Sequence, residues 1–280
     1  MSIVVIDNQM VHYEVLGRGR PVVFLHGWLG SWRYWFPTME VVAEHFRTYS
    51  FDFWGFGESR RKQTQESIQA YSDQITRFLD ALGMDQVILV GHSMGGMVAL
   101  KTALSYPERI CGVATVGAPI NGDSLSWLLK LTDRPFFADA FARMPWLRRQ
   151  LFRFFLGVAN DLSTGEMVED SVKSSANTLR YAVSSMWRTD LRPELPRLRV
   201  PALIVHGGRD DVVNPNQADL FTHNPKAEVV MMPRSRHFPF LEEPALFNDV
   251  LLRFLKANAP PATQRLPEQL VAQRESTTPV

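Results

Sequence analysis

The hexapeptide Gly-His-Ser-Met-Gly-Gly at 91–96 follows directly on the apolar run 87–90. A serine between glycines immediately after a predicted strand is typical of a nucleophile elbow, a tight turn from a strand into a helix. Such a turn strains the backbone at Ser93 and brings its neighbours into near contact, so Gly91 and Gly95 are needed to give room. The pattern predicts a reactive Ser93 with its hydroxyl above the end of a sheet.

Short apolar, β-branched runs alternate with helical patterns along most of the chain. The pattern predicts strands at 3–6, 11–16, 22–25, 48–51, 87–90, 113–116, 202–205 and 228–232. It predicts helices at 66–82, 94–106, near 217–221 and at 244–255. Helical crossovers between strands indicate an α/β fold with a mostly parallel sheet that is buried on both faces.

Between residues 120 and 199 this alternation stops, and the sequence becomes aromatic, helical and punctuated by proline. We interpret 120–199 as an inserted helical cap, 1–119 and 200–258 as one core domain, and 259–280 as a flexible tail. One apolar helix face is predicted from the spacing i, i+4, i+7 and i+8 of Leu147, Leu151, Phe154 and Phe155. The same stretch contains Arg143, Arg148, Arg149 and Arg153.

Composition excludes several classes of protein. The 280 residues are 45% hydrophobic, enough for a large core, and 30 Lys and Arg balance 29 Asp and Glu. This balance gives no general attraction to nucleic acid, and no apolar stretch approaches the length of a membrane span, so we expect neither partner. Cys111 is the single cysteine and lies in an apolar stretch, so we interpret it as a core residue. With no secretory signal pattern at the first residues, we expect a cytoplasmic protein.

An active serine needs a base within hydrogen-bond reach and an acid that orients that base. The segment 206–213, which reads His-Gly-Gly-Arg-Asp-Asp-Val-Val, follows a predicted strand and offers Asp210. His237 lies in a loop before the last predicted helix. The order serine, acid, histidine is the one found in α/β-hydrolase folds. Asp211, one residue on, and Asp123, after the sixth predicted strand, are alternative acids.

Five motifs occur in one order: His-Gly-Trp at 26–28, Asp-Phe-Trp-Gly-Phe-Gly-Glu-Ser at 52–59, then 91–96, 207–210 and 237–243. With them, residues 3–255 resemble the α/β-hydrolase superfamily, in the group of serine esterases and perhydrolases with a helical cap. The resemblance implies an eight-stranded, mostly parallel sheet with helices on both faces. It also implies that Ser93 is the nucleophile, His237 the general base and then acid, and Asp210 the residue that orients His237.

The same resemblance implies an oxyanion hole made of the backbone N–H groups of Trp28 and Met94. Asp52 is expected to brace a loop, His26 to shape the oxyanion loop, and the His92 side chain to point away from Ser93. The remaining histidines, His12, His45, His206 and His223, lack metal-ligand spacing, so we expect no metal and no cofactor. Members of the superfamily with dehalogenase or epoxide hydrolase activity have aspartate at the elbow, so serine argues against both activities.

The aromatic cap predicts a small-molecule substrate, a carboxylic ester with an apolar acyl or alcohol part. Substrate-binding side chains are predicted at Trp28, Trp32, Trp127 and Phe141. Two alternatives keep the same catalytic residues. A perhydrolase would use hydrogen peroxide against the acyl enzyme, and a carbon–carbon bond hydrolase would bind a diketone, with Arg143 or Arg188 near its carboxylate.

A different class remains open: a receptor of this fold that binds without turnover, or a module that contacts anionic lipid through the basic, aromatic stretch 141–155. We expect a solvated arginine face there rather than a lipid contact, and no stable membrane insertion. Oligomeric state, natural substrate and pathway do not follow from the sequence.

Overall fold

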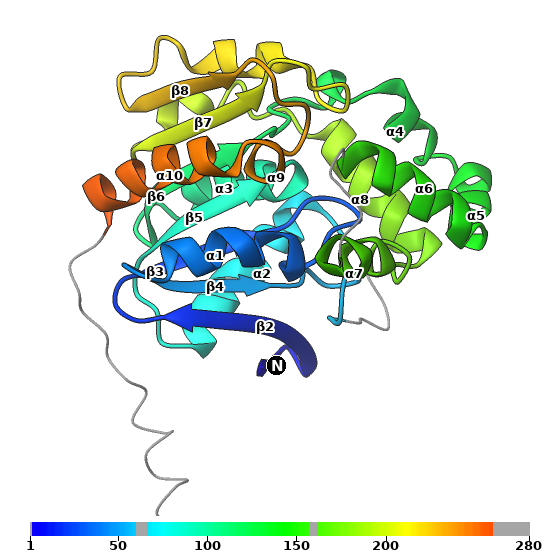
Figure 1. Cartoon of the computed structure of the whole chain (residues 1–280), viewed down its shortest axis with the longest axis horizontal. Helices are drawn as coiled ribbons and strands as arrows, with labels where there is room; N and C mark the ends of the chain where they lie inside the picture. Colours follow the sequence, from blue (N-terminus) through cyan, green and yellow to red (C-terminus); the bar gives the residue numbers. More distant parts are fainter. Residues whose placement is uncertain (1, 60–65, 157–161, 260–280) are drawn as a thin grey trace, which may run out of the picture.

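Eight strands form one sheet in the order β1-β2-β4-β3-β5-β6-β7-β8 (Figure 1). The computed structural model describes residues 2–59, 66–156 and 162–259. Strands β3 to β8 pair in parallel, whereas β2 pairs antiparallel with both β1 and β4. The predicted mostly parallel, eight-stranded sheet is therefore confirmed. The strands are β1 (Ser2–Ile6), β2 (Gln9–Gly17), β3 (Pro21–Leu25), β4 (Arg47–Phe51), β5 (Val87–His92), β6 (Ile110–Val116), β7 (Ala202–Gly207) and β8 (Ala227–Met232).

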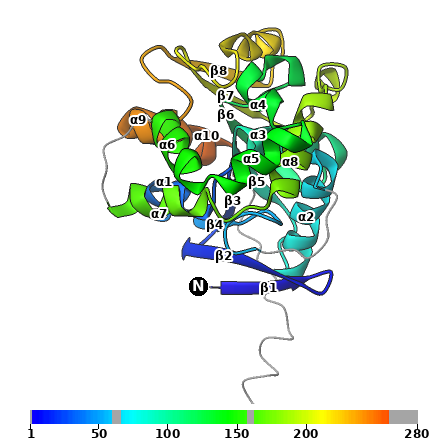
Figure 2. The ribbon, with the colours of Figure 1, turned by 90° about the vertical axis from the view of Figure 1, so that its right-hand side faces the viewer.

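Helices cover both faces of the sheet. On one face α2 contacts α3, and on the other α1 contacts α10, as the two views show (Figures 1 and 2). These helices are α1 (Phe36–Val42), α2 (Ile68–Ala81), α3 (Met94–Ser105) and α10 (Pro244–Asn258), with the short α9 (Pro239–Glu242) before α10. Strands β5 and β7 are buried along their whole length, because neighbouring elements cover them on both faces.

A second group of helices follows β6 and precedes β7. It contains α4 (Trp127–Leu131), α5 (Pro135–Arg143), α6 (Pro145–Leu156), α7 (Leu162–Asp170) and α8 (Ala176–Arg188). These helices gather at one end of the sheet (Figures 1 and 2). The two ends of this segment meet, because Leu191 N–H donates to Ile120 O at 2.9 Å and Gly122 N–H donates to Thr189 O at 3.0 Å.

The predicted strands and helices are present in the structure, with three main differences. The segment from 32 to 42, for which no element was predicted, forms the 3₁₀ helix η1 (Trp32–Trp35) and α1. Trp35 explains its stability, because the indole is fully buried, donates to Leu25 O at 3.0 Å and stacks on Phe240 at 4.3 Å. The helix predicted near 217–221 is the 3₁₀ helix η4 (Pro215–Phe221).

The third difference is the face of α6. Leu147, Leu151 and Phe155 line one apolar cavity, but Phe154 is 60% exposed, because the buried side of α6 is centred on Arg148, Phe152 and Leu156. The predicted tail 259–280 lies, apart from its first residue, outside the described residues. Among the residues that the structure describes, none of the helices has both the length and the apolar character needed to cross a membrane.

Candidate active site

Ser93 lies where β5 ends and α3 begins. Its backbone has φ 51° and ψ −117°, a combination that L-residues rarely adopt, and its N–H donates to Val116 O at 2.8 Å. A Cβ atom added to Gly91 would collide with the backbone of Gly95, and one added to Gly95 would collide with the Leu25 carbonyl. The glycines therefore give the room that this turn requires, as predicted.

Asp210 and His237 come together from loops after two neighbouring strands, β7 and β8. His237 Nδ1 lies 2.8 Å from Asp210 Oδ2, and both side chains are buried. Asp210 Oδ1 accepts the backbone N–H groups of Val212 at 2.9 Å and Val213 at 3.0 Å. His206 Nε2 lies 3.1 Å from the same Oδ2 atom. The carboxylate is therefore surrounded by four N–H groups and its orientation is fixed.

Electrostatics keep Asp210 ionised. Burial alone would raise the pKa of this carboxyl group, but the electrostatic attraction of the His237 ring and the hydrogen bonds from His206 and His237 outweigh burial and lower the pKa far below its usual range. Sequence reasoning gave His206 no role at the site. The only signal was its place at the end of a strand, four residues before the acid.

The alternative acids lie elsewhere. The Asp211 side chain is 46% exposed and pairs with Arg236. Asp123 is exposed, and its backbone N–H donates to Asn121 Oδ1 at 3.0 Å in the turn before α4. Of the three carboxyl groups, Asp210 is the one hydrogen-bonded to His237.

His92 links two loops of the site. Its Nε2 donates to His237 O at 2.9 Å, and its Nδ1 lies 3.2 Å from the Tyr34 hydroxyl, which in turn accepts the N–H of Gly27. Burial lowers the pKa of His92 well below its usual value, so the ring is neutral. We expected this side chain to point away from Ser93, yet it lines the same small cavity. The reason is that the ring packs against the His237 ring, with centroids 4.7 Å apart.

His26 and Asp52 have structural contacts, as expected. His26 Nδ1 donates to Gly27 O at 2.8 Å, and its Nε2 accepts Phe53 N–H at 2.9 Å. Both ring nitrogens are occupied, and burial lowers the pKa of the ring. Asp52 accepts the backbone N–H of Trp32 at 2.8 Å, which braces the start of η1. Within the described ranges, no group of three His, Cys, Asp or Glu side chains could hold a metal ion.

Trp28 lines the cavity that contains Ser93, and Met94 follows Ser93 in the chain. Met94 is the first residue of α3, so its N–H is one of the helix-start groups that have no acceptor inside the helix. Trp28 lies in the turn closed by Gly30 N–H donating to Gly27 O at 3.0 Å, and Leu29 has φ 64°. The Trp28 indole donates to Leu179 O in α8 at 3.2 Å. This bond ties the turn to the helices above it.

Two apolar cavities adjoin each other at this place. The first, of about 30 Å³, contains Ser93 and His237. The second, of about 140 Å³, lies between α4, α5 and α6, and its walls are almost entirely apolar. Three side chains border both cavities: Trp28, Leu129 and Phe155. Phe141 lines the second cavity and stacks on Trp28, with centroids 6.0 Å apart and planes at 9°.

The other two predicted substrate-binding residues lie elsewhere. Trp32 packs against His12, at 5.8 Å between centroids, and against Phe36 at the same distance. Trp127 is 73% exposed on α4. Among the described residues that line the two cavities, neither tryptophan occurs.

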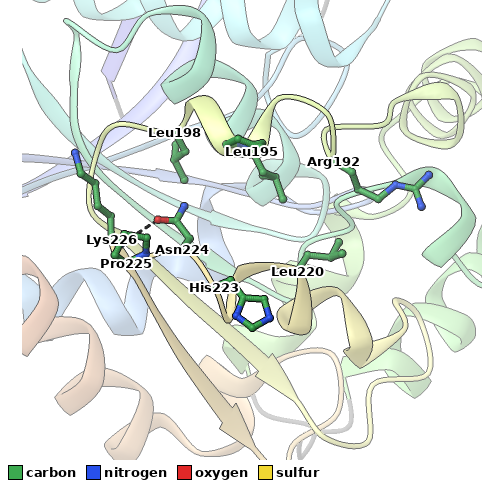
Figure 3. Close-up of a pocket in the computed structure, with 9 residues that line it drawn as sticks. Arg192, Leu195, Leu198, Leu220, His223, Asn224, Pro225 and Lys226 are labelled. Atoms are coloured by element: carbon green, nitrogen blue, oxygen red, sulfur yellow. Dashed lines mark hydrogen bonds between the residues drawn. The ribbon is translucent and has the colours of Figure 1, made fainter.

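A groove of about 540 Å³ lies apart from this site. Leu195, Leu198 and Leu220 form its apolar wall, and Arg192, His223 and Lys226 lie at its edges (Figure 3). None of its described lining residues borders the cavity that contains Ser93. Cys111 is also distant from the site and half-buried, and burial raises the pKa of its thiol to about 11.

The chain belongs to the α/β hydrolase fold family, whose model matches residues 20–244. It is 28% identical over 248 residues to a pimeloyl-[acyl-carrier protein] methyl ester esterase of Nitrosomonas europaea, covering 85% of this chain and 96% of that relative. It is 29% identical over 254 residues to a dihydrolipoyllysine-residue acetyltransferase component of an acetoin cleaving system of Pseudomonas putida. That match covers 87% of this chain and spans 66% of the relative's length.

Among solved structures, an esterase from Exiguobacterium antarcticum superposes with a TM-score of 0.76 at 25% identity, covering 91% of this chain and 98% of the esterase. The family and these relatives make the chain a hydrolytic enzyme of the α/β hydrolase fold.

Proposed function

We propose that this hydrolase is a serine esterase that acts on carboxylic esters with an apolar part through an acyl-Ser93 intermediate. The observation that supports this most strongly is the 2.8 Å hydrogen bond between His237 Nδ1 and Asp210 Oδ2 beside the strained Ser93. A histidine held by an ionised carboxylate next to a serine is the arrangement that activates a hydroxyl for acyl transfer.

The proposed reaction has two halves. Ser93 Oγ attacks the ester carbonyl while His237 Nε2 takes its proton, and the same proton then goes to the departing alcohol. In the second half, His237 removes a proton from water, the hydroxyl attacks the acyl group, and Ser93 regains its proton. Asp210 stays ionised throughout and stabilises the imidazolium.

We propose that the Trp28 and Met94 N–H groups bind the oxyanion that forms in both halves. The start of α3 adds a positive dipole end at the same place. Each such donor is worth about 3 kcal/mol of transition-state stabilisation. The single cysteine supports the further proposal that the enzyme acts in the cytoplasm.

The cavity between α4, α5 and α6 supports an apolar substrate. Its volume of about 140 Å³ suits a short alkyl chain or one aromatic ring, and it adjoins the Ser93 cavity across Trp28, Leu129 and Phe155. We propose that it holds the apolar part of the ester. Phe141→Ala would then enlarge the cavity and shift the preferred ester towards longer chains.

The test is hydrolysis of p-nitrophenyl esters from acetate to decanoate by the wild type, Ser93→Ala and Ser105→Ala. Ser105 lies exposed at the far end of α3, so its substitution is the matched control. We expect Ser93→Ala to lower kcat by about 10⁴-fold or more and Ser105→Ala to leave it unchanged.

Mass spectrometry of the quenched reaction would identify the acyl group on the peptide that contains Ser93. Hydrolysis that survives in Ser93→Ala would refute the mechanism. Wild-type turnover of a ring-cleavage diketone with no turnover of any ester would refute the substrate class and favour the carbon–carbon hydrolase alternative.

A further inference from the structure

Helix α6 buries Arg148 together with Phe152 and Leu156, yet it exposes two aromatic side chains. Its inward position Arg148 is almost completely buried, whereas Trp146 and Phe154 are 64% and 60% exposed. Trp146, Arg153 and Phe154 fall at i, i+7 and i+8, so they share the outward face of the helix. Packing on the core accounts for the buried Phe152, but it does not account for the exposed Trp146 and Phe154.

Helix α5 repeats the pattern next to α6. Phe136 is 76% exposed, and Arg143, seven residues later, lies exposed on the same side. The two helices contact each other and lie at the end of the molecule away from the sheet (Figures 1 and 2). Five residues define what we term the outer face: Phe136, Arg143, Trp146, Arg153 and Phe154. Exposed aromatic side chains that gather in one region of a surface are a feature of contact sites.

The positive charge of residues 134–156 indicates which kind of partner the outer face would bind. Residues 134–156 contain five arginines and one acid, Asp139, which gives a local net charge of +4. Arg149 is neutralised by Glu169 at 2.7 Å, and Arg148 donates to the carbonyls of Ser171 and Ser174. A second copy of the same face would bring like charges together, so the charge disfavours a symmetric dimer. An anionic partner with an apolar layer fits both kinds of side chain.

We propose that the outer face docks reversibly on an anionic lipid surface. Arg143 and Arg153 would contact lipid phosphates, and the aromatic rings would lie at the level of the headgroups. The apolar cavity lies between α4 and these same two helices, and it adjoins the Ser93 cavity. Delivery of an apolar ester from lipid to this cavity rests on the proposed esterase function. The docking itself does not.

The test is co-sedimentation of Ser93→Ala with vesicles of phosphatidylcholine alone or with 30% phosphatidylglycerol, at low and high salt. Ser93→Ala is used so that the lipid stays intact. We expect binding only to the anionic vesicles and its loss at high salt. Replacing both outer-face arginines by glutamine is expected to weaken binding about 30-fold, from the usual contribution of a basic residue at such a surface.

Matched controls come from α10, on another face. Arg253→Gln removes an exposed arginine, and Leu246→Gln removes an apolar side chain that is 47% exposed. Both are expected to bind like the parent. Trp146→Gln with Phe154→Gln should also weaken binding, while hydrolysis of a soluble short ester by the same variant on a wild-type background stays unchanged. Melting temperatures would establish that each variant is folded.

Several results would overturn the docking proposal. One is no sedimentation with anionic vesicles at low salt, and another is equal binding by the arginine variant and by Arg253→Gln. A concentration-dependent dimer that disappears in the Trp146 and Phe154 variant, without vesicle binding, would assign the face to a second copy. If the wild type hydrolysed no ester in any assay but still bound the vesicles, the proposed function would be refuted. The docking proposal would not be affected by that result.

Discussion

Gly117 follows β6 and is a sensitive test of the proposed acid–base pair. Its φ is 56°, and a Cβ atom added there would lie 3.1 Å from His237 Nδ1 and 3.2 Å from Asp210 Oδ2. These are the two atoms of the 2.8 Å hydrogen bond. Gly117→Ala therefore changes the geometry of the pair without removing any of its functional groups.

The expected magnitudes follow from these contacts. An alanine at positive φ costs about 1–2 kcal/mol, so the free energy of unfolding should fall by that amount and the melting temperature by about 2–8 °C. Relief of both contacts needs a shift of a few tenths of an ångström. Because a displacement of about 1 Å can cost about 100-fold in rate, we expect kcat to fall about 10-fold. KM should change little, since Gly117 borders neither of the two cavities in the described residues.

The assay is p-nitrophenyl ester hydrolysis with full kcat and KM determination, beside urea unfolding of the same samples. Gly112→Ala is the control, because Gly112 lies in β6, five residues before Gly117, and its added Cβ would meet Ile88 and Phe254 at ordinary distances of 3.4 Å. We expect wild-type kcat from this control. Wild-type kcat in a destabilised Gly117→Ala would refute the reasoning, since the pair would then tolerate displacement.

Three further predictions concern individual side chains. His206→Phe removes an N–H group from Asp210, so the carboxylate acts more strongly on His237 and the acid limb of the kcat/KM profile should move up by about half a pH unit; His206→Gln should restore it, and an unmoved profile in both would contradict this role. Burial lowers the pKa of His92 in the folded state, so the unfolded chain binds more protons below about pH 6.5 and stability should decrease from pH 7 to 5. Urea unfolding of His92→Gln should have a smaller decrease over that range, and an equal decrease would count against it. The Cys111 thiol, with its pKa raised to about 11, should react slowly with Ellman's reagent at pH 8 and rapidly in urea, and fast reaction of the folded enzyme would contradict this assignment.

The core strands could be predicted from sequence because burial on both faces requires continuous apolar runs, as in β5. The antiparallel pairing of β1 and β2 could not, because pairing depends on which strands meet in space. The helical segment 32–42 was missed for a related reason. Its two short helices depend on the packing of Trp35 against Phe240, which is distant in sequence.

The candidate site divides in the same way. Ser93 was predictable because an elbow is a local structure, determined by glycines within two residues. The role of His206 was not, since its contact with Asp210 joins the end of a strand to a loop, where sequence spacing carries no geometric rule. In the sequence, Asp210 was favoured over Asp211 only because it completes the motif at 207–210. The geometric difference is the pair of backbone N–H groups that hold Oδ1.

The helices α4 to α8 leave the core after Ile120 and return at Leu191, and these two residues are hydrogen-bonded to each other. A chain segment that departs and returns at one place behaves as an interchangeable part. Its length and composition can be altered while the strands on either side keep their spacing. Grafting a relative's segment between these two residues would thus be a direct route to a different substrate preference. Ser93, Asp210 and His237 lie outside the segment and would be retained.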